Sequence, residues 1–140
     1  MQDLLAQGMI ELAKGAWSSP LVLVRKKDQS WQFCVDYRKL NAVTLQDTYP
    51  LPRIDESLDA LAGSKYFSTL DLTSGYWQVP LNADAQEKFA FTTRSGLCKW
   101  KVLPLGLTSA PATFQRLMEQ VLHGLHWKTL LLYLDDVMLS

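Results

Sequence analysis

The sequence predicts an α+β fold in which strands outnumber helices. Several short runs rich in β-forming residues are separated by turn residues, as in consecutive hairpins. Two stretches, 53–62 and 109–125, instead space their apolar residues as a helix does. Because the strands follow one another as hairpins, they favour an antiparallel sheet with the helices packed on one face.

Within the first 52 residues, the sequence pattern predicts one hairpin. The runs 21–24 and 31–35 are rich in β-forming residues, and the residues between them give the hairpin a basic tip. Before this hairpin, residues 3–7 resemble the last turns of a helix that ends at Gly8. After the hairpin, we expect residues 41–52 to be irregular.

The middle of the chain predicts a helix, a strand that ends on an acid, and a compact turn. Residues 53–62 form the helix, and Gly63 supplies its C-terminal stop. Residues 66–71 form the strand, with Asp71 at its end. Residues 73–78 form the turn.

The following part predicts a second hairpin and a longer helix. Residues 89–93 and 97–102 pair across a turn at Gly96. A loop at 103–109 leads into a helix that Ser109 can cap and whose first turn tolerates proline. Its apolar face comprises Phe114, Leu117, Met118, Val121 and Leu125.

The doublet Asp135-Asp136 is the most informative feature of the sequence. It lies between the apolar runs 129–132 and 137–139, so we predict strand, turn and strand. Two adjacent charged carboxylates in a poorly hydrated place are costly, and a divalent cation is an economical compensation. If the strand that ends in Asp71 is a neighbour, three carboxylates meet at one end of a sheet. Taken alone, Asp71 is explained more simply as a turn residue.

The chemistry of that acidic set predicts a hard metal ion. All-oxygen ligands suit magnesium or manganese rather than zinc. Two such ions about 4 Å apart can clamp the attacking and leaving oxygens of phosphoryl transfer. A second arrangement, His123 and His126 three residues apart, can also bind metal, but without another His pair or a Cys nearby it is the weaker candidate.

Composition limits the classes of protein that fit. The 140 residues suffice for one ordinary domain, and 48% hydrophobic with 20% charged residues fits a globular protein. No apolar run approaches the roughly 20 residues of a membrane span, so no membrane partner is predicted. The two cysteines form no zinc pattern. Net charge is zero, which argues against a simple electrostatic nucleic-acid binder.

The basic residues are nevertheless clustered. Five of the 14 basic residues fall within a short stretch, namely Arg25, Lys26, Lys27, Arg38 and Lys39. A local basic patch can hold phosphates in a neutral protein. A hairpin that is merely well solvated explains the same residues, and charge alone favours this simpler explanation.

Seven stretches, in order along nearly the whole chain, resemble the reverse transcriptase of gypsy-type long-terminal-repeat retrotransposons. They are SPLVLVRKKD at 19–28, FCVDYRKLN at 33–41, YPLPRI at 49–54, FSTLDL at 67–72, GYWQV at 75–79, APATFQ at 110–115 and YLDD at 133–136. An ordered series of this kind is far more specific than one four-residue motif.

The resemblance implies a right-hand polymerase fold with a discontinuous fingers and palm. The fingers would be residues 1–45 and 79–108, and the palm residues 46–78 and 109–140. The thumb, connection and ribonuclease H portions of such polyproteins would lie outside this segment, so the segment alone need not polymerise. Cytoplasmic particles, with DNA that later reaches the nucleus, are the expected location.

The resemblance also implies catalytic roles. Asp71 and Asp135 would be the main ligands of two magnesium or manganese ions, together with the backbone carbonyl of Leu72. Asp136 would be the second acid of the doublet and contribute less directly. The reaction would add deoxynucleotides to a primer on an RNA or DNA template.

Nucleotide contacts follow from the same resemblance. Lys26 and the backbone amides of Ser74 and Gly75 would contact the triphosphate. Tyr76 would lie under the incoming sugar and leave no room for a 2′-hydroxyl, the group that separates RNA from DNA building blocks. Gln32 stands where relatives usually carry an arginine, and it supplies neither that charge nor a bidentate fork.

The resemblance also implies a wall of the nucleotide pocket and contacts with the template. Leu105 and Gly106 would line the nucleotide pocket, and Arg38 and Pro111 would contact the template. Gln29 replaces the glycine common at the hairpin tip, which predicts a strained or remodelled turn.

Two rival functions remain open at this point. An RNA-dependent RNA polymerase is disfavoured by Tyr76 at the gate position and by the Tyr133-Leu134 pair before the doublet. A decayed or domesticated element that only binds nucleic acid is disfavoured by the intact acids but favoured by Gln32.

Overall fold

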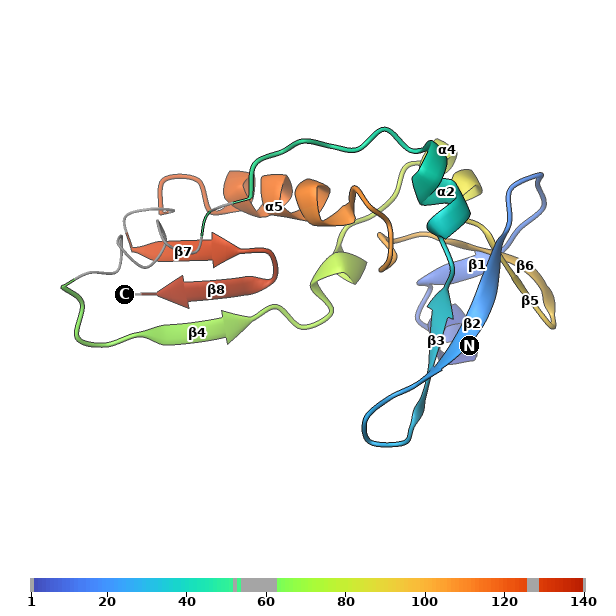
Figure 1. The fold of residues 1–140 in the computed structure, drawn as a ribbon, viewed down its shortest axis with the longest axis horizontal. Coiled ribbons are helices and arrows are strands. Elements are labelled where there is room, and N and C mark those ends of the chain that lie inside the picture. The colour runs from blue at the N-terminus through green and yellow to red at the C-terminus, as the bar shows by residue number, and fades with distance from the viewer. Residues whose placement is uncertain (1, 52, 54–62, 126–128, 140) are drawn as a thin grey trace. The chain divides into compact units, whose positions relative to one another are not determined.

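The computed structural model describes residues 2–51, 53, 63–125 and 129–139 (Figure 1). The chain divides into two compact units, and each unit is built from two separate segments. Unit 1 comprises Met1–Leu45 with Tyr76–Ala110, and unit 2 comprises Gln46–Gly75 with Pro111–Ser140. These bounds lie close to those expected for fingers and palm, and the assignment of those two names stays a prediction.

Unit 1 contains a five-stranded sheet in the order β1-β6-β5-β2-β3. The strands are β1 (Ile10–Leu12), β2 (Ser19–Arg25), β3 (Trp31–Val35), β5 (Phe91–Thr93) and β6 (Gly96–Trp100). Both hairpins predicted in this unit, β2–β3 and β5–β6, are confirmed as antiparallel pairs, although β5 and β6 are shorter than expected.

The expectation of a wholly antiparallel sheet is wrong at one pair. Strands β2 and β5 run parallel, with Ser19 opposite Phe91 and Pro20 opposite Thr92. Strand β1, which was not predicted, pairs with β6. Both pairings join segments far apart in the chain, whereas the hairpin pattern reports only neighbours in sequence.

The tip of the β2–β3 hairpin is strained as expected. The ladder runs from Leu21 opposite Val35 to Arg25 opposite Trp31, and the Lys26 amide donates to the Ser30 carbonyl at 2.8 Å. Gln29 has a φ of 69°, in the left-handed region that favours glycine. The hairpin therefore forms without the usual glycine, but one residue is held in a costly conformation.

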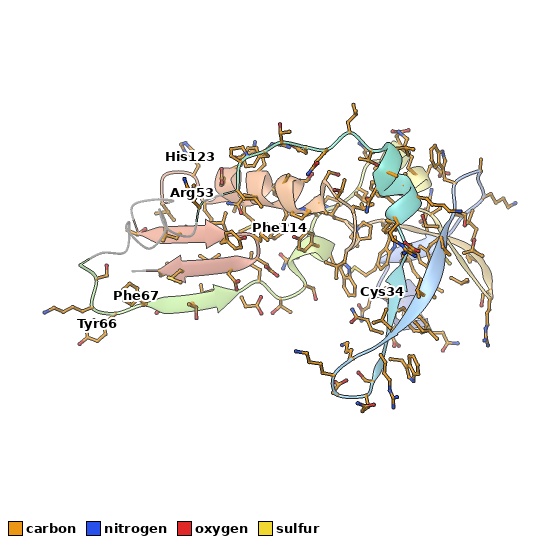
Figure 2. The ribbon with its side chains drawn as sticks, in the orientation of Figure 1. Cys34, Arg53, Tyr66, Phe67, Phe114 and His123 are labelled. Carbon is orange, nitrogen blue, oxygen red and sulfur yellow. The ribbon has the colours of Figure 1, made fainter. Side chains whose placement is uncertain are left out.

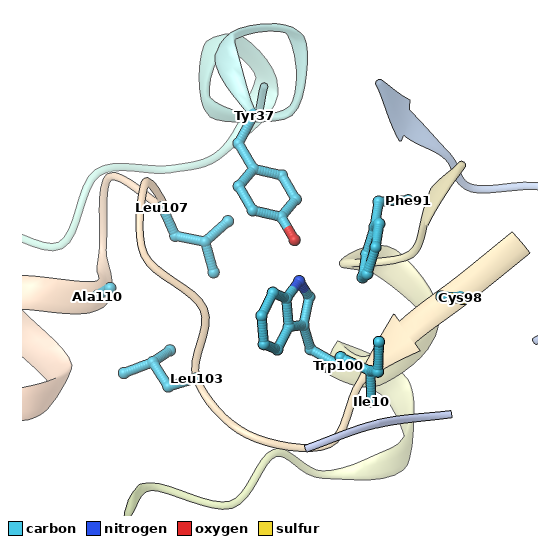
Figure 3. Packing of buried hydrophobic residues seen from close by; sticks show 8 residues of the cluster. All are labelled: Ile10, Tyr37, Phe91, Cys98, Trp100, Leu103, Leu107 and Ala110. Atoms are coloured by element: carbon cyan, nitrogen blue, oxygen red, sulfur yellow. The ribbon is translucent and has the colours of Figure 1, made fainter. Parts of the chain in front are cut away.

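The core of unit 1 is an aromatic cluster (Figure 3). The Trp100 ring lies 5.6 Å from Phe91 and 5.9 Å from Trp77, measured between ring centroids. Tyr37 donates its hydroxyl hydrogen to the Phe89 carbonyl at 2.9 Å, and burial raises the pKa of this phenol. The buried members are Ile10, Tyr37, Phe91, Cys98, Trp100, Leu103, Leu107 and Ala110.

Unit 1 has three short α-helices among its described residues, besides most of the 3₁₀-helix η1 (Gly75–Gln78). The first, α1 (Gln2–Ala6), ends before Gly8 as predicted. The expectation that residues 41–52 are irregular is wrong at its start, because α2 (Arg38–Val43) extends into it. The third, α4 (Ala83–Lys88), was not predicted. Its N-terminus is capped by the Asn82 side chain, which accepts from the Ala85 amide at 2.8 Å.

Unit 2 contains a three-stranded antiparallel sheet in the order β4-β8-β7. The strands are β4 (Ser68–Asp71), β7 (Leu130–Tyr133) and β8 (Asp136–Leu139). Strand β4 starts two residues later than predicted, and Tyr66 and Phe67 before it are exposed (Figure 2). The helix predicted at 53–62 lies outside the described residues, apart from Arg53.

Helix α5 (Ala110–Val121) supplies the rest of the unit 2 core. Phe114 is buried, and Met118 packs against the cluster of Leu130, Leu132 and Val137, as expected of a core methionine. The predicted apolar face is not covered along its whole length, since Val121 and Leu125 are 67% and 50% exposed. Leu122 packs on the cluster instead. Within the described ranges, no helix is long and apolar enough to cross a bilayer.

Candidate active site

The predicted acids meet at one end of the unit 2 sheet. Asp71 lies directly opposite Asp136 on the neighbouring strand, so both side chains project from the same face. The Leu72 amide donates to the Asp135 carbonyl at 3.1 Å and continues the pairing beyond the last residues of the ladder. The expectation that the Asp71 strand neighbours the doublet is therefore confirmed. Their catalytic role stays a prediction.

Two residues beside these acids hold a strained backbone. Leu134, in the two-residue turn between β7 and β8, has a φ of 55°, and Ser74 has a φ of 54°. A side chain in the left-handed region costs about 1–2 kcal/mol, and such residues gather at functional sites. The hairpin tip residue Gln29 is the third non-glycine residue of this kind among those the structure describes.

Gly75 lets the backbone lie close to the side chains of Phe114 and Asp135. A Cβ atom at this position would lie 2.9 Å from Cζ of Phe114 and 3.6 Å from Cβ of Asp135. The Gly75 amide donates to the Leu72 carbonyl at 3.1 Å. The resemblance assigns the Gly75 amide to the triphosphate and the Leu72 carbonyl to the metal, and in this structure the two groups bond each other. Ser74, the other expected amide donor, lies between them in sequence.

The donor chemistry of the site fits a hard divalent cation. Asp71, Asp135 and Asp136 offer carboxylate oxygens, the ligands that magnesium prefers. Across residues 2–51, 53, 63–125 and 129–139, however, no three His, Cys, Asp or Glu side chains are gathered closely enough to hold a metal ion. The sheet brings the three acids to one end without assembling a finished ligand set.

Four of the predicted nucleotide contacts line one cavity in unit 1. This cavity has a volume of about 510 Å³ and is lined by Lys26, Gln32, Leu105 and Gly106 together with aromatic residues that include Trp31 and Trp77. Tyr76, the predicted gate, is half-buried against the unit 1 core. The structure therefore places Lys26 and Gln32 from β2–β3 beside the loop that carries Gly106.

Asn41 anchors that loop and was not identified from the sequence. Its Nδ2 donates to the Gly106 carbonyl at 2.8 Å, and its Oδ1 accepts from the Thr108 amide at 3.0 Å. Gly106 has a φ of 97°, which only glycine adopts readily. One side chain thus holds both ends of the segment 106–108.

The predicted template residues lie at the starts of two helices. Arg38 begins α2, and its Nη2 donates to Oδ2 of Asp36 at 2.7 Å. The hydrogen bond from the Arg38 side chain lowers the pKa of Asp36 to about 2. Pro111 is the second residue of α5, where a missing amide hydrogen is tolerated.

A polar network on α5 was also missed by sequence reasoning. Arg116 donates to both carboxylate oxygens of Asp47, and its guanidinium lies 4.6 Å from the centre of the Tyr49 ring. The Tyr49 hydroxyl in turn donates to Glu119. No sequence signal pointed to these pairs, because their members are about 70 residues apart.

The chain belongs to the reverse transcriptase (RNA-dependent DNA polymerase) family, whose model matches residues 24–140. It is 40% identical, over 99% of its length, to the retrovirus-related Pol polyprotein from transposon 297 of Drosophila melanogaster, of which it spans 14%. It is 44% identical to an RNA-directed DNA polymerase homolog of Oenothera berteroana, over 77% of the chain and 76% of that protein.

Solved structures agree with this family assignment. The foamy viral protease-reverse transcriptase in complex with an RNA/DNA hybrid is similar to this chain at a TM-score of 0.83 and 30% identity. The match covers 99% of this chain and 18% of that one. The match to the same type of enzyme with double-stranded DNA has the same TM-score and identity. The right-hand polymerase fold predicted from the sequence is thus confirmed for the part that this chain spans. Reverse transcriptases generally use divalent metal ions.

Proposed function

We propose that this chain is the fingers-and-palm part of an RNA-directed DNA polymerase. The observation that carries the proposal is the register of unit 2, which sets Asp71 opposite Asp136 next to the turn that holds Asp135. The proposed substrates are deoxynucleoside triphosphates and a primer paired with an RNA or DNA template. The thumb, connection and ribonuclease H would be supplied by the rest of a polyprotein.

The reaction is a nucleotidyl transfer. A bond forms between the primer 3′-oxygen and the α-phosphorus of the nucleotide, and the bond from that phosphorus to the oxygen of the leaving pyrophosphate breaks. The 3′-hydroxyl loses its proton to solvent. Two bound magnesium ions would stabilise the charge on the attacking and leaving oxygens. Asp71 and Asp135 would hold these ions, and Asp136 would support them.

The unit 1 cavity supplies the proposed nucleotide contacts. Lys26 brings a positive charge to its lining, and Leu105 and Gly106 line it in the loop that Asn41 holds in place. Gln32 lines the same cavity without a charge. Because phosphoryl transfer depends on positioning and on charge stabilisation, the absence of a charge at position 32 predicts weaker nucleotide binding rather than loss of chemistry.

Primer extension tests the proposal. The longer chain that carries this segment is given an RNA template, a DNA primer, deoxynucleotides and magnesium. We expect the Asp135→Asn variant to lose at least about 100-fold in extension rate, because it removes one of the charges that would hold the metal. Asp84→Asn is the matched control, since Asp84 is an exposed acid in unit 1 that pairs with Lys88.

The Gln32→Arg variant separates the two candidate functions. If it extends primers at lower nucleotide concentrations than wild type, the missing charge limits an active polymerase. If neither wild type nor Gln32→Arg extends a primer that the folded protein binds, the polymerase proposal fails. That result would favour a domesticated module that binds nucleic acid without catalysis.

A further inference from the structure

One side chain from α5 holds the turn that carries the acidic doublet. Oε1 of Gln115 accepts from the Leu134 amide at 2.8 Å, and its Nε2 donates to the Leu132 carbonyl at 3.3 Å. Gln115 is fully buried, with 0% of its surface exposed. These two bonds hold Leu132, near the end of β7, and Leu134, the residue whose φ is 55°.

Glu119 determines which way the Gln115 amide points. Nε2 of Gln115 donates to Oε1 of Glu119 at 2.8 Å. An ionised carboxylate can only accept, so the amide nitrogen must face Glu119 and the amide oxygen must face the Leu134 amide. The other carboxylate oxygen of Glu119 accepts from the Tyr49 hydroxyl, and this bond raises the pKa of Tyr49.

The turn conformation decides where the doublet sits. Asp135 follows Leu134 directly, and its carbonyl accepts the Leu72 amide next to Asp71. Leu134 is the first residue of this two-residue turn. If its φ became negative, the turn would change type and the residues after it would rotate. A buried amide without its acceptor is also unfavourable, which adds a reason for the turn to rearrange.

We propose that Gln115 is a positioning residue. It holds Leu134 in the left-handed conformation and thereby keeps Asp135 and Asp136 in place against Asp71, while Glu119 and Tyr49 hold its amide in the required orientation. This inference rests on the proposed polymerase function. It assigns no contact between Gln115 and substrate or metal.

Three variants and one control separate this role from packing. Gln115→Met keeps the length of the side chain and removes all three hydrogen bonds. Gln115→Glu keeps the acceptor for Leu134 but sets two carboxylates against each other. Combining it with Glu119→Gln exchanges the two groups and restores a donor–acceptor pair. Gln120→Met is the control, because Gln120 is an exposed glutamine on the same helix.

Amide hydrogen exchange tests the tether without any need for catalysis. In Gln115→Met we expect the Leu134 amide to exchange at least 10-fold faster. The amide of Leu122, which bonds to the Met118 carbonyl on α5, should be unchanged and serves as the internal reference. Equal exchange at Leu134 in wild type and Gln115→Met would overturn the proposal.

Single-turnover primer extension tests the catalytic consequence in the longer chain. We expect Gln115→Met to lower the rate at least 10-fold and to raise the magnesium concentration at half-maximal rate. The dissociation constant for primer-template should stay within twofold of wild type. The double variant Gln115→Glu with Glu119→Gln should recover most of the extension rate that Gln115→Glu alone loses. If Gln115→Met does not fold, this double variant provides the test of the positioning role.

Two results would count against the proposal in different ways. In the first, the Leu134 amide of Gln115→Met exchanges faster, but its extension rate and magnesium dependence match wild type. Gln115 would then have only a structural role, although the polymerase function stands. If wild type itself extends no primer while Leu134 exchange still depends on Gln115, the proposed function fails and the positioning role fails with it.

Discussion

Replacing Gly75 with alanine should destabilise unit 2 through one contact. The new Cβ would lie 2.9 Å from Cζ of Phe114, a distance that real Cβ atoms do not tolerate, and 3.5 Å from Cβ of Leu72. Phe114 is 2% exposed, so its ring has no solvent to move into. Because Gly75 does not have a positive φ, the backbone itself accepts alanine.

The size of the effect follows from two opposing contributions. Overpacking a tight core costs about 1–3 kcal/mol. Alanine in place of glycine at a compatible φ gains about 0.4–1 kcal/mol by restricting the unfolded chain. We therefore expect Gly75→Ala to lower the free energy of unfolding by about 1–2 kcal/mol, measured by chemical denaturation of the full chain.

Gly15→Ala is the matched control for this substitution. Gly15 also lacks a positive φ, but its new Cβ would meet the end of a flexible Glu87 side chain at 3.1 Å. We expect this variant to stay within about 0.5 kcal/mol of wild type, as most surface substitutions do. The reasoning is refuted if Gly75→Ala is as stable as Gly15→Ala. The reasoning is supported further if Phe114→Leu lowers the free energy of unfolding less in the Gly75→Ala background than in wild type.

The other predictions concern the hairpin and the acid next to it. Gln29→Gly should raise the free energy of unfolding by about 0.5 kcal/mol in denaturation, because glycine adopts the φ of 69° without steric cost; an unchanged or lower stability would contradict this. Arg38→Met should raise the pKa of Asp36 from about 2 toward its ordinary 3.8, as followed by carboxyl NMR shifts. Since the folded-state pKa is the lower one, the pair stabilises the fold above pH 3.8, and this stabilisation is lost as the pH falls toward 2. A pKa that stays near 2 in the variant would exclude the Arg38 side chain as the cause.

Local pattern predicted the elements that depend on sequence neighbours. The β2–β3, β5–β6 and β7–β8 hairpins form where alternating or apolar runs flank turn residues, because such pairing needs only a short loop. The same logic failed for the parallel β2–β5 pair, which joins strands about 70 residues apart. Helices α2 and α4, each of 6 residues, are too short to show a clear apolar period.

The candidate site was predictable as a set of acids but not as a geometry. The doublet Asp135-Asp136 and the strand-end Asp71 were evident from the sequence, and their pairing follows from the β4–β8 register. The supporting residues were not evident. Apart from Glu119, the partners of Gln115 and Asn41 lie 17 to 67 residues away, and no periodicity distinguishes such polar residues from solvated ones.

The way each unit is assembled from two segments has a consequence for the order of biosynthesis. During translation, residues up to 45 leave the ribosome before the second half of unit 1 has been made, because that half begins at Tyr76. The β2–β3 hairpin can close early, but β5 and β6 reach it only some 70 residues later. Leu21 and Val35 of this hairpin pack against the unit 1 core in the folded protein, and they lack that packing partner until the second segment has been made.

The same arrangement governs how the chain can be cut. A break after residue 45 or after residue 75 divides unit 1, and a break after residue 75 or after residue 110 divides unit 2. No single cleavage therefore releases both units whole. A protease nick at any of these three points would separate strands from their partners in the chain. Expression of unit 2 by itself requires its two segments to be rejoined by a new linker.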